Sequence, residues 1–154
     1  MEKFIITESA YNEILFTVGT RKPESGGILL GSRNDYIVKK FVFDATGTFT
    51  DKGYDPDTKF LNIIIANEWR ENNLQLLGFL HSHPRGIARL SGDFGNNIGD
   101  IGYIRAIFKA TPALQKLLTP IMFTSSDGGE IKIIPFIANR DDEENYYEAE
   151  LAII

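Results

Sequence analysis

The chain contains no cysteine among its 154 residues. This absence excludes disulfide scaffolds, thiolate nucleophiles and cysteine-based zinc sites, because each of them needs a thiol. Histidine is scarce as well, with two residues in the whole chain. Any metal site must therefore be built from these two histidines and from carboxylates.

Long apolar runs and clusters of basic residues are also missing. No run approaches the roughly 18 apolar residues of a membrane span, and "MEKFIITESA" has Glu2 and Lys3 where the apolar core of a signal peptide would lie. We therefore expect a cytoplasmic protein without membrane contact. The formal net charge of −5 argues against nucleic acid, because phosphate binding needs clustered Lys and Arg. A protein or peptide partner is the better expectation.

The length predicts a single domain over residues 1–154 that can bury its own core. The elements predicted from hydrophobic spacing and turn residues follow in chain order. They are a strand at 3–7, a helix from the N-cap Thr7 to Gly19, a hairpin with its turn at 32–35, a surface loop at 44–57, a helix at 57–73, a buried strand at 74–82, a helical segment at 98–118 with a break at Pro112, and closing strands around "SDGG". This order predicts an α+β, α/β sandwich-like fold with a curved mixed sheet flanked by helices.

Several side chains are expected in the core. Trp69, on the helix at 57–73, is assigned to core packing and not to recognition. The predicted hairpin contributes Ile28, Leu30, Val38 and Val42.

Both histidines stand in "LGFLHSHPRG", at the end of the strand predicted at 74–82. Side chains at i and i+2 of a strand share one face, so His81 and His83 can converge on one ion. His-x-His alone is a weak pattern, since such pairs are also found on surfaces and in satisfied cores. Two further features are Glu24, which precedes two glycines in "PESGGILLG", and Ser91, eight positions after His83.

Together, Glu-x-Gly-Gly-x-Leu-x-Gly and, about sixty residues later, His-Ser-His-Pro-x6-Ser with a following Asp resemble the JAMM motif of the JAB/MPN metalloprotease family. The resemblance covers nearly the whole chain, because the predicted order of elements also fits that fold, which is of the cytidine-deaminase-like type. It implies a zinc isopeptidase, similar to deubiquitinases, that cuts ubiquitin or a ubiquitin-like protein from its conjugates. A free-standing domain of this kind is similar to the prokaryotic members, which implies ubiquitin-like and activating-enzyme-like partners.

The resemblance also implies roles for these residues. Two imidazoles and one carboxylate leave the fourth zinc position open for water, which is typical of a catalytic site. Zinc lowers the pKa of such a water to about 7. Glu24 would take the proton of that water and pass it to the leaving amine. Ser91 would donate a hydrogen bond to the oxyanion of the tetrahedral intermediate.

The third ligand departs from the family pattern, because the spacing Ser-x-x-Asp places Phe94 where the Asp belongs. Asp93 lies one residue early. Asp100 lies six residues late, but with Asn97 as an N-cap it would reproduce the capping geometry at a helix start. We favour Asp100, with a six-residue insertion after Ser91, and Asp93 is the alternative.

Two other functions stay open at this point. One is a catalytically inactive MPN-like interaction module, for which the misplaced Asp is the support. The other is a different zinc hydrolase on the same fold, for example one that releases an amino acid from a small carrier protein. The acidic stretch "DDEENYYEAE" is expected to be a solvated face.

Overall fold

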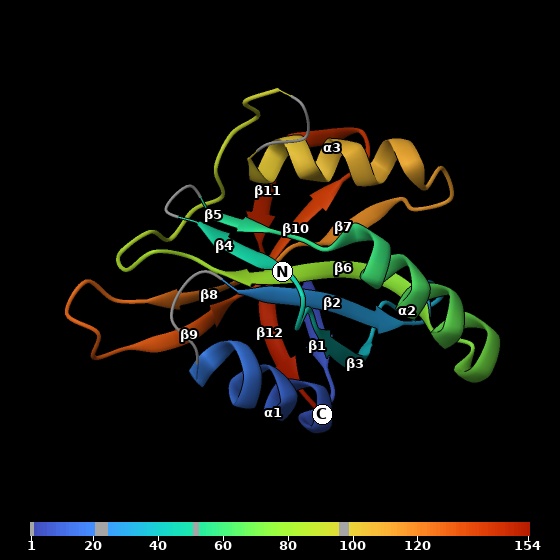
Figure 1. Ribbon diagram of the computed structural model, residues 1–154, viewed down its shortest axis with the longest axis horizontal. Helices are drawn as coiled ribbons and strands as arrows, with labels where there is room; N and C mark the ends of the chain where they lie inside the picture. The colour runs from blue at the N-terminus through green and yellow to red at the C-terminus, as the bar shows by residue number, and fades with distance from the viewer. Residues whose placement is uncertain (1, 21–24, 51–52, 96–98) are drawn as a thin grey trace.

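The structure is a computed structural model that describes residues 2–20, 25–50, 53–95 and 99–154 (Figure 1). Its elements, in chain order, are β1 (Lys3–Ile6), α1 (Glu8–Thr17), the 3₁₀ turn η1 (Val18–Thr20), β2 (Gly26–Gly31), β3 (Val38–Phe43), β4 (Thr48–Thr50), β5 (Gly53–Asp55), α2 (Thr58–Asn72), β6 (Gln75–Ser82), α3 (Asp100–Ala110), β7 (Lys116–Leu118), β8 (Ile121–Thr124), β9 (Ile131–Ile134), β10 (Phe136–Asn139), β11 (Asp142–Glu148) and β12 (Glu150–Ile153).

One large mixed sheet runs through the described part of the chain, in the order β11-β10-β7-β6-β2-β3-β1-β12, with β8 paired to β6 and β9 to β8. The pairs β2–β3 and β2–β6 are antiparallel, whereas β1–β12 and β6–β8 are parallel. β11 and β12 stand at opposite ends of this order although Ala149 alone separates them in sequence. The sheet therefore curls, and it brings its two ends together.

The helices cover both faces of the curled sheet. α1 packs on a cluster that includes Leu29 and Leu80, α2 packs on Ile28 and Leu30, and α3 packs on a cluster that includes Phe79. In Figure 1, α1 and α3 lie on opposite sides of the sheet. Because successive strand residues point to opposite faces, Phe79 and Leu80 of β6 serve different helices.

Close packing of the central strands depends on Gly78. A Cβ atom at this position would lie 1.8 Å from the carbonyl oxygen of Leu118 on β7. Gly78 and Leu118 are register partners in the parallel pair β6–β7. Only glycine allows the two backbones to approach so closely.

Most of the predicted elements are confirmed. α1 begins after Thr7, whose side chain accepts a hydrogen bond from the N–H of Ala10. α2 begins after Asp57 in the same manner, and β2–β3 form the expected antiparallel hairpin. Ile28, Leu30 and Val38 are buried, and Val42 is partly buried against the same cluster as Ile28. The mixed α/β architecture is the one that the sequence predicts.

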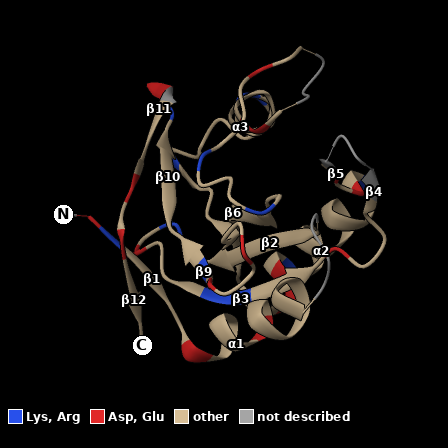
Figure 2. Cartoon of the chain, turned by 90° about the vertical axis from the view of Figure 1, so that its left-hand side faces the viewer, with Lys and Arg blue, Asp and Glu red and all other residues tan. Residues whose placement is uncertain are grey.

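Three predictions from the sequence were wrong. Residues 44–57 are not a plain surface loop, since they contain the antiparallel hairpin β4–β5 and the fully buried Asp44. Residues after Pro112 form β7 and not a continued helix, because pairing with β10 outweighs helix propensity. Trp69 is 54% exposed and lies outside the core. The acidic stretch is largely exposed, as expected of a solvated face, and it forms β11 on the side of the molecule opposite β4–β5 (Figure 2).

No helix in the described residues is both long and apolar enough to cross a membrane.

Candidate metal centre

β6 carries both histidines to the edge of α3. Phe79 faces the cluster beneath α3, so the side chains two and four positions later, His81 and His83, point to the same face. Register partners on both sides hold the strand end in place, with Gly26 of β2 and Ile121 of β8 opposite His81. Both histidines are 5% exposed. The neighbouring strands therefore fix the direction of two imidazoles that are almost excluded from solvent.

The first turn of α3 presents Asp100 to these imidazoles, and Ser91 fixes its position. The N–H of Asp100 donates to Ser91 Oγ at 2.8 Å, and the N–H of Ser91 donates to Asp100 Oδ2 at 2.7 Å. The carbonyl of Ser91 also accepts from the N–H of Ile101. This reciprocal pair has the chemistry of a capping box, although nine positions and not three separate the two residues.

Three side chains then meet at one point. Asp100 Oδ1 lies 2.9 Å from His81 Nε2, and Asp100 Oδ2 lies 3.1 Å from His83 Nε2. The two Nε2 atoms lie 2.8 Å apart. Among the described residues, this is the group of His, Asp and Glu side chains whose donor atoms could hold a metal ion.

The carboxylate at this point is ionised. Burial alone raises the pKa of the Asp100 carboxyl, but the charge and hydrogen bond of His81, followed by those of His83, outweigh burial and hold the pKa well below its usual range. Two Nε2 atoms at 2.8 Å cannot both carry a hydrogen, because the hydrogens would collide. At least one imidazole must therefore direct a lone pair into the cluster.

The donor set fits a zinc ion. Ligands at about 2.0–2.2 Å from a tetrahedral zinc lie roughly 3.3 Å from one another. The two Nε2 atoms lie 2.8 Å apart, and each lies 2.9–3.1 Å from one oxygen of the Asp100 carboxylate, so the ligands need to open by a few tenths of an ångström. Two imidazoles and one carboxylate supply three of four positions, which leaves one for a reacting group.

Three residues named in the sequence analysis remain, namely Glu24, Asn97 and Asp93. Glu24, the expected proton carrier, and Asn97, the expected N-cap, lie outside the described residues. The N-cap of α3 is Gly99, and no side chain of this residue can cap the helix, so Ser91 supplies the cap. Asp93 points away from the histidines, since its carboxylate pairs with Arg105 at 2.7 Å and accepts from the N–H of Gly95.

Sequence reasoning missed Tyr54 and Asp44, which contact the surroundings of His81. The ring of Tyr54 lies 6.5 Å from the His81 ring at an interplanar angle of 26°, and its hydroxyl donates to Asp44. A weak signal was present in "TFTDKGYD", where the turn residues of Asp-Lys-Gly separate two segments that are too short to show periodicity. Such a pattern is typical of a hairpin.

Neither a family model nor a curated protein matches the chain. Among solved structures, it is similar to the solution structure of protein DSY2949 from Desulfitobacterium hafniense, with a TM-score of 0.62 and 20% identity. The match covers 100% of this chain and 93% of that chain. At this identity the likeness shows the fold alone, and the fold it shows is a mixed α/β architecture.

Proposed function

We propose that this chain is a zinc-dependent peptidase of the JAB/MPN type that hydrolyses the bond between the C-terminus of a ubiquitin-like protein and its target or precursor tail. The observation that carries the proposal is the convergence of two imidazole Nε2 atoms and one carboxylate within 3.1 Å. The JAMM-like order of Glu24, the histidines and Ser91 supports the same reading.

The link between Ser91 and Asp100 supports the assignment to this family in spite of the unusual spacing. In the family pattern, Ser-x-x-Asp begins a helix and supplies both the cap and the third ligand. Here the reciprocal hydrogen bonds bring the two residues into the same relation across a six-residue insertion. We therefore assign Asp100, and not Asp93, as the third ligand.

The residues of this chain would divide the chemistry as follows. His81, His83 and Asp100 hold the ion, and zinc supplies a Lewis-acidic centre that polarises a carbonyl group and makes water acidic near neutral pH. Glu24 accepts the proton of the attacking water and delivers it to the leaving amine. Ser91 accepts one hydrogen bond from the Asp100 N–H, and its hydroxyl proton is left to donate to the developing oxyanion.

The partners follow from the substrate class. The flexible C-terminal tail of a ubiquitin-like protein can add to an exposed strand edge as an extended segment. An activating-enzyme-like protein would supply conjugates of that protein. We place the reaction in the cytoplasm and expect neither nucleic acid nor membrane to take part.

A cleavage assay tests this proposal. The substrates are ubiquitin-like proteins fused to a C-terminal tail, with an aminoacylated carrier protein as a substrate of another class. The wild-type chain loaded with zinc should release the tail, and Glu24→Gln should lose about 100-fold to 10,000-fold of the rate while zinc binding stays unchanged. Full activity in Glu24→Gln would contradict the mechanism. Release of the amino acid alone would favour the other hydrolase.

The inactive interaction module is the second candidate. Its support is the cluster itself, since His81, His83 and Asp100 can satisfy one another around a shared proton without an ion. A chain that stays free of zinc after reconstitution, and still binds a ubiquitin-like protein, would favour this alternative.

A further inference from the structure

Two aromatic rings lie beside the imidazole of His81. Phe79, two positions earlier on β6, has its ring centroid 6.0 Å from that of His81 at an interplanar angle of 24°. Tyr54, from β5, lies at 6.5 Å and 26°. Phe79 is itself held edge-on by Tyr103 of α3, at 4.7 Å and 82°. The plane of the His81 ring is therefore aligned with two neighbours from different elements.

The usual device for orienting a metal-binding imidazole is absent from the described residues. A ligating histidine normally donates its second ring N–H to a carboxylate, a carbonyl oxygen or water, and this hydrogen bond fixes the ring. The Nδ1 atom of His81 is buried and has no hydrogen-bond partner within the described ranges. The orientation of the His81 ring therefore depends on its contacts with the rings of Phe79 and Tyr54.

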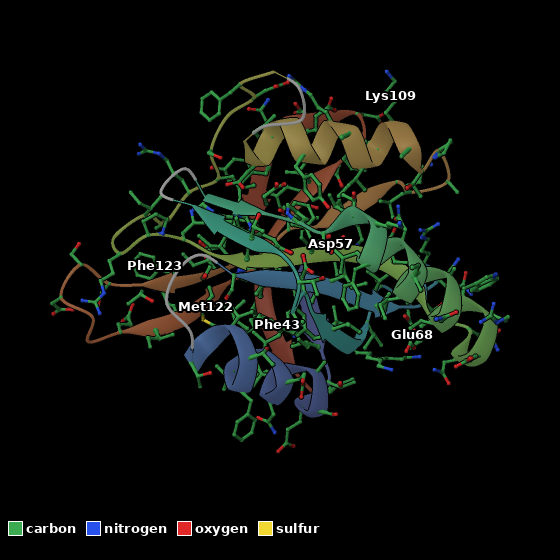
Figure 3. All side chains as sticks on the ribbon, in the orientation of Figure 1. Phe43, Asp57, Glu68, Lys109, Met122 and Phe123 are labelled. Carbon is green, nitrogen blue, oxygen red and sulfur yellow. The ribbon has the colours of Figure 1, made fainter. Side chains whose placement is uncertain are left out.

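Phe79 lies on the same strand as His81, whereas Tyr54 lies on β5 and is fixed by residues outside β6. Its hydroxyl donates to Asp44 Oδ2 at 2.5 Å, and the same oxygen accepts from the N–H of Asp57 at 2.9 Å. Asp44 is fully buried, and its own N–H donates to the carbonyl of Gly26 on β2. Figure 3 labels Asp57 at the start of α2, directly after the β4–β5 hairpin. Asp44 thus connects the hairpin, the start of α2 and the start of β2.

The contact between Tyr54 and the central sheet leaves no spare room. A Cβ atom at Gly26 would lie 2.8 Å from Cε2 of Tyr54 and 3.0 Å from Cβ of His81. Glycine at this position lets the tyrosine ring reach the strand pair that carries the histidine. Gly26 also belongs to the Glu-x-Gly-Gly pattern of the sequence, so this packing gives one of its glycines a physical reason.

We propose that Tyr54 is a positioning residue of the metal centre: its ring, anchored through the hydroxyl to buried Asp44, holds the His81 imidazole beside Phe79 in the orientation that ligation requires. This inference rests on the proposed function, because it assigns Tyr54 a task in ion binding. Tyr54 acts through His81 and takes no part in the chemistry itself.

The test compares Tyr54→Leu, which removes the ring, with Tyr54→Phe, which keeps the ring and removes its anchor. Tyr147→Phe is the control, because it removes another tyrosine–carboxylate hydrogen bond, from Tyr147 of β11 to Glu2, and leaves the ring contacts of His81 intact. The probes are Zn²⁺ affinity by chelator competition, the visible spectrum of the Co²⁺-loaded protein, and the imidazole resonances of the metal-free protein. Circular dichroism checks that each variant folds.

We expect Tyr54→Leu to weaken Zn²⁺ binding by about 10-fold to 100-fold, the range found when the outer partner of a ligating histidine is lost. Tyr54→Phe should recover most of that loss, and Tyr147→Phe should match the wild type. The Co²⁺ spectrum and the His81 resonances should change in Tyr54→Leu. Unchanged affinity, spectrum and resonances in a folded Tyr54→Leu would overturn the inference.

Two further outcomes are distinguishable. If Tyr54→Leu does not fold, the test rests on Tyr54→Phe. Loss of the hydrogen bond to Asp44 should loosen the ring and broaden the His81 resonances. An unaltered line shape would contradict the inference. If the wild type binds no metal, the proposed function fails. The resonances of His81 in the metal-free variants then still decide whether Tyr54 orders the ring.

Discussion

Asp44 and Asp100 are two carboxylates of low exposure around the His81 site, and their hydrogen-bond partners differ. Asp100 faces two imidazole nitrogens and the N–H of Ser91. Asp44 accepts from the hydroxyl of Tyr54 and from the N–H of Asp57. Imidazole nitrogens can offer lone pairs to a cation, whereas a phenol and an amide offer hydrogens. The same functional group thus belongs to the proposed metal centre in one place and is a structural anchor in the other.

The pKa shifts around the two carboxylates differ in the same way. The histidines hold the pKa of Asp100 well below its usual range in spite of burial. Burial first, and then the hydrogen bond to Asp44, raises the pKa of Tyr54 far above its ordinary value. The surroundings therefore favour the charged form of Asp100 and the neutral, hydrogen-donating form of Tyr54.

The largest expected difference is in metal affinity. Asp100→Asn should weaken Zn²⁺ binding at least about 100-fold, because it removes a ligand, whereas Asp44→Asn should stay within the roughly 10-fold to 100-fold range of an outer partner. Chelator competition measures both. Equal losses of Zn²⁺ affinity in the two variants would contradict the assignment of Asp100 as a ligand and Asp44 as an outer anchor.

For the stability of the metal-free protein we expect the opposite order, with a larger loss on substitution of Asp44 than on substitution of Asp100. Asp44→Ala removes the carboxylate that accepts from the Tyr54 hydroxyl and from the N–H of Asp57, and the loss of such an acceptor costs about 1–3 kcal/mol. We expect a loss of about 3 kcal/mol in the free energy of unfolding by urea, and a smaller loss for Asp100→Ala. Exposed Asp141→Ala is the matched control. If Asp44→Ala lost no more free energy of unfolding than the control, Asp44 would not be a structural anchor.

Substitution of Ser91, the partner of Asp100, should have a smaller effect on stability. Ser91→Ala removes the acceptor for the Asp100 N–H, and the loss of such a cap costs about 1 kcal/mol. Ser91→Thr keeps a hydroxyl and should retain most of that stability. Thermal unfolding of the pair measures the difference, which must vanish if Ser91 does not cap α3.

The smallest effect appears at alkaline pH. Phenols of the unfolded chain ionise near pH 10, whereas burial raises the pKa of Tyr103 to about 12 and that of Tyr54 further. The folded state therefore holds protons that the unfolded state has lost, and stability present below pH 10 declines as the pH rises through 12. Urea unfolding from pH 9 to 11 should show this decline, less steeply in Tyr54→Phe. Identical slopes would count against a buried Tyr54 phenol.

The sequence allowed the part of the site on β6 to be predicted, because strand alternation alone places His81 and His83 on one face. It also allowed Asp100 to be favoured over Asp93 as the third ligand, through a capping pattern with Asn97, although the N-cap proved to be Gly99 and the partner of Asp100 proved to be Ser91. That choice depended on a helix start, which hydrophobic spacing and capping residues reveal.

Asp44 and Tyr54 could not be predicted in the same way. Their contact joins residues ten positions apart through a hairpin of two three-residue strands. Such short strands carry little periodicity, and polar residues in a Gly- and Asp-rich stretch are typical of a loop. β7 was missed for a related reason, since its pairing partners on β6 and β10 lie far away in the chain and local propensity does not contain that information. β11 pairs with the neighbouring β10 through a short turn, and it was missed because acidic residues have low strand propensity.

Elemental analysis of zinc in the purified wild-type chain, beside Asp100→Ala and Asp93→Ala, tests the central claim most directly. The account predicts about one zinc per chain in the wild type and in Asp93→Ala, and none in Asp100→Ala. A wild type free of zinc after reconstitution, or an Asp100→Ala chain that keeps its full content, would contradict it.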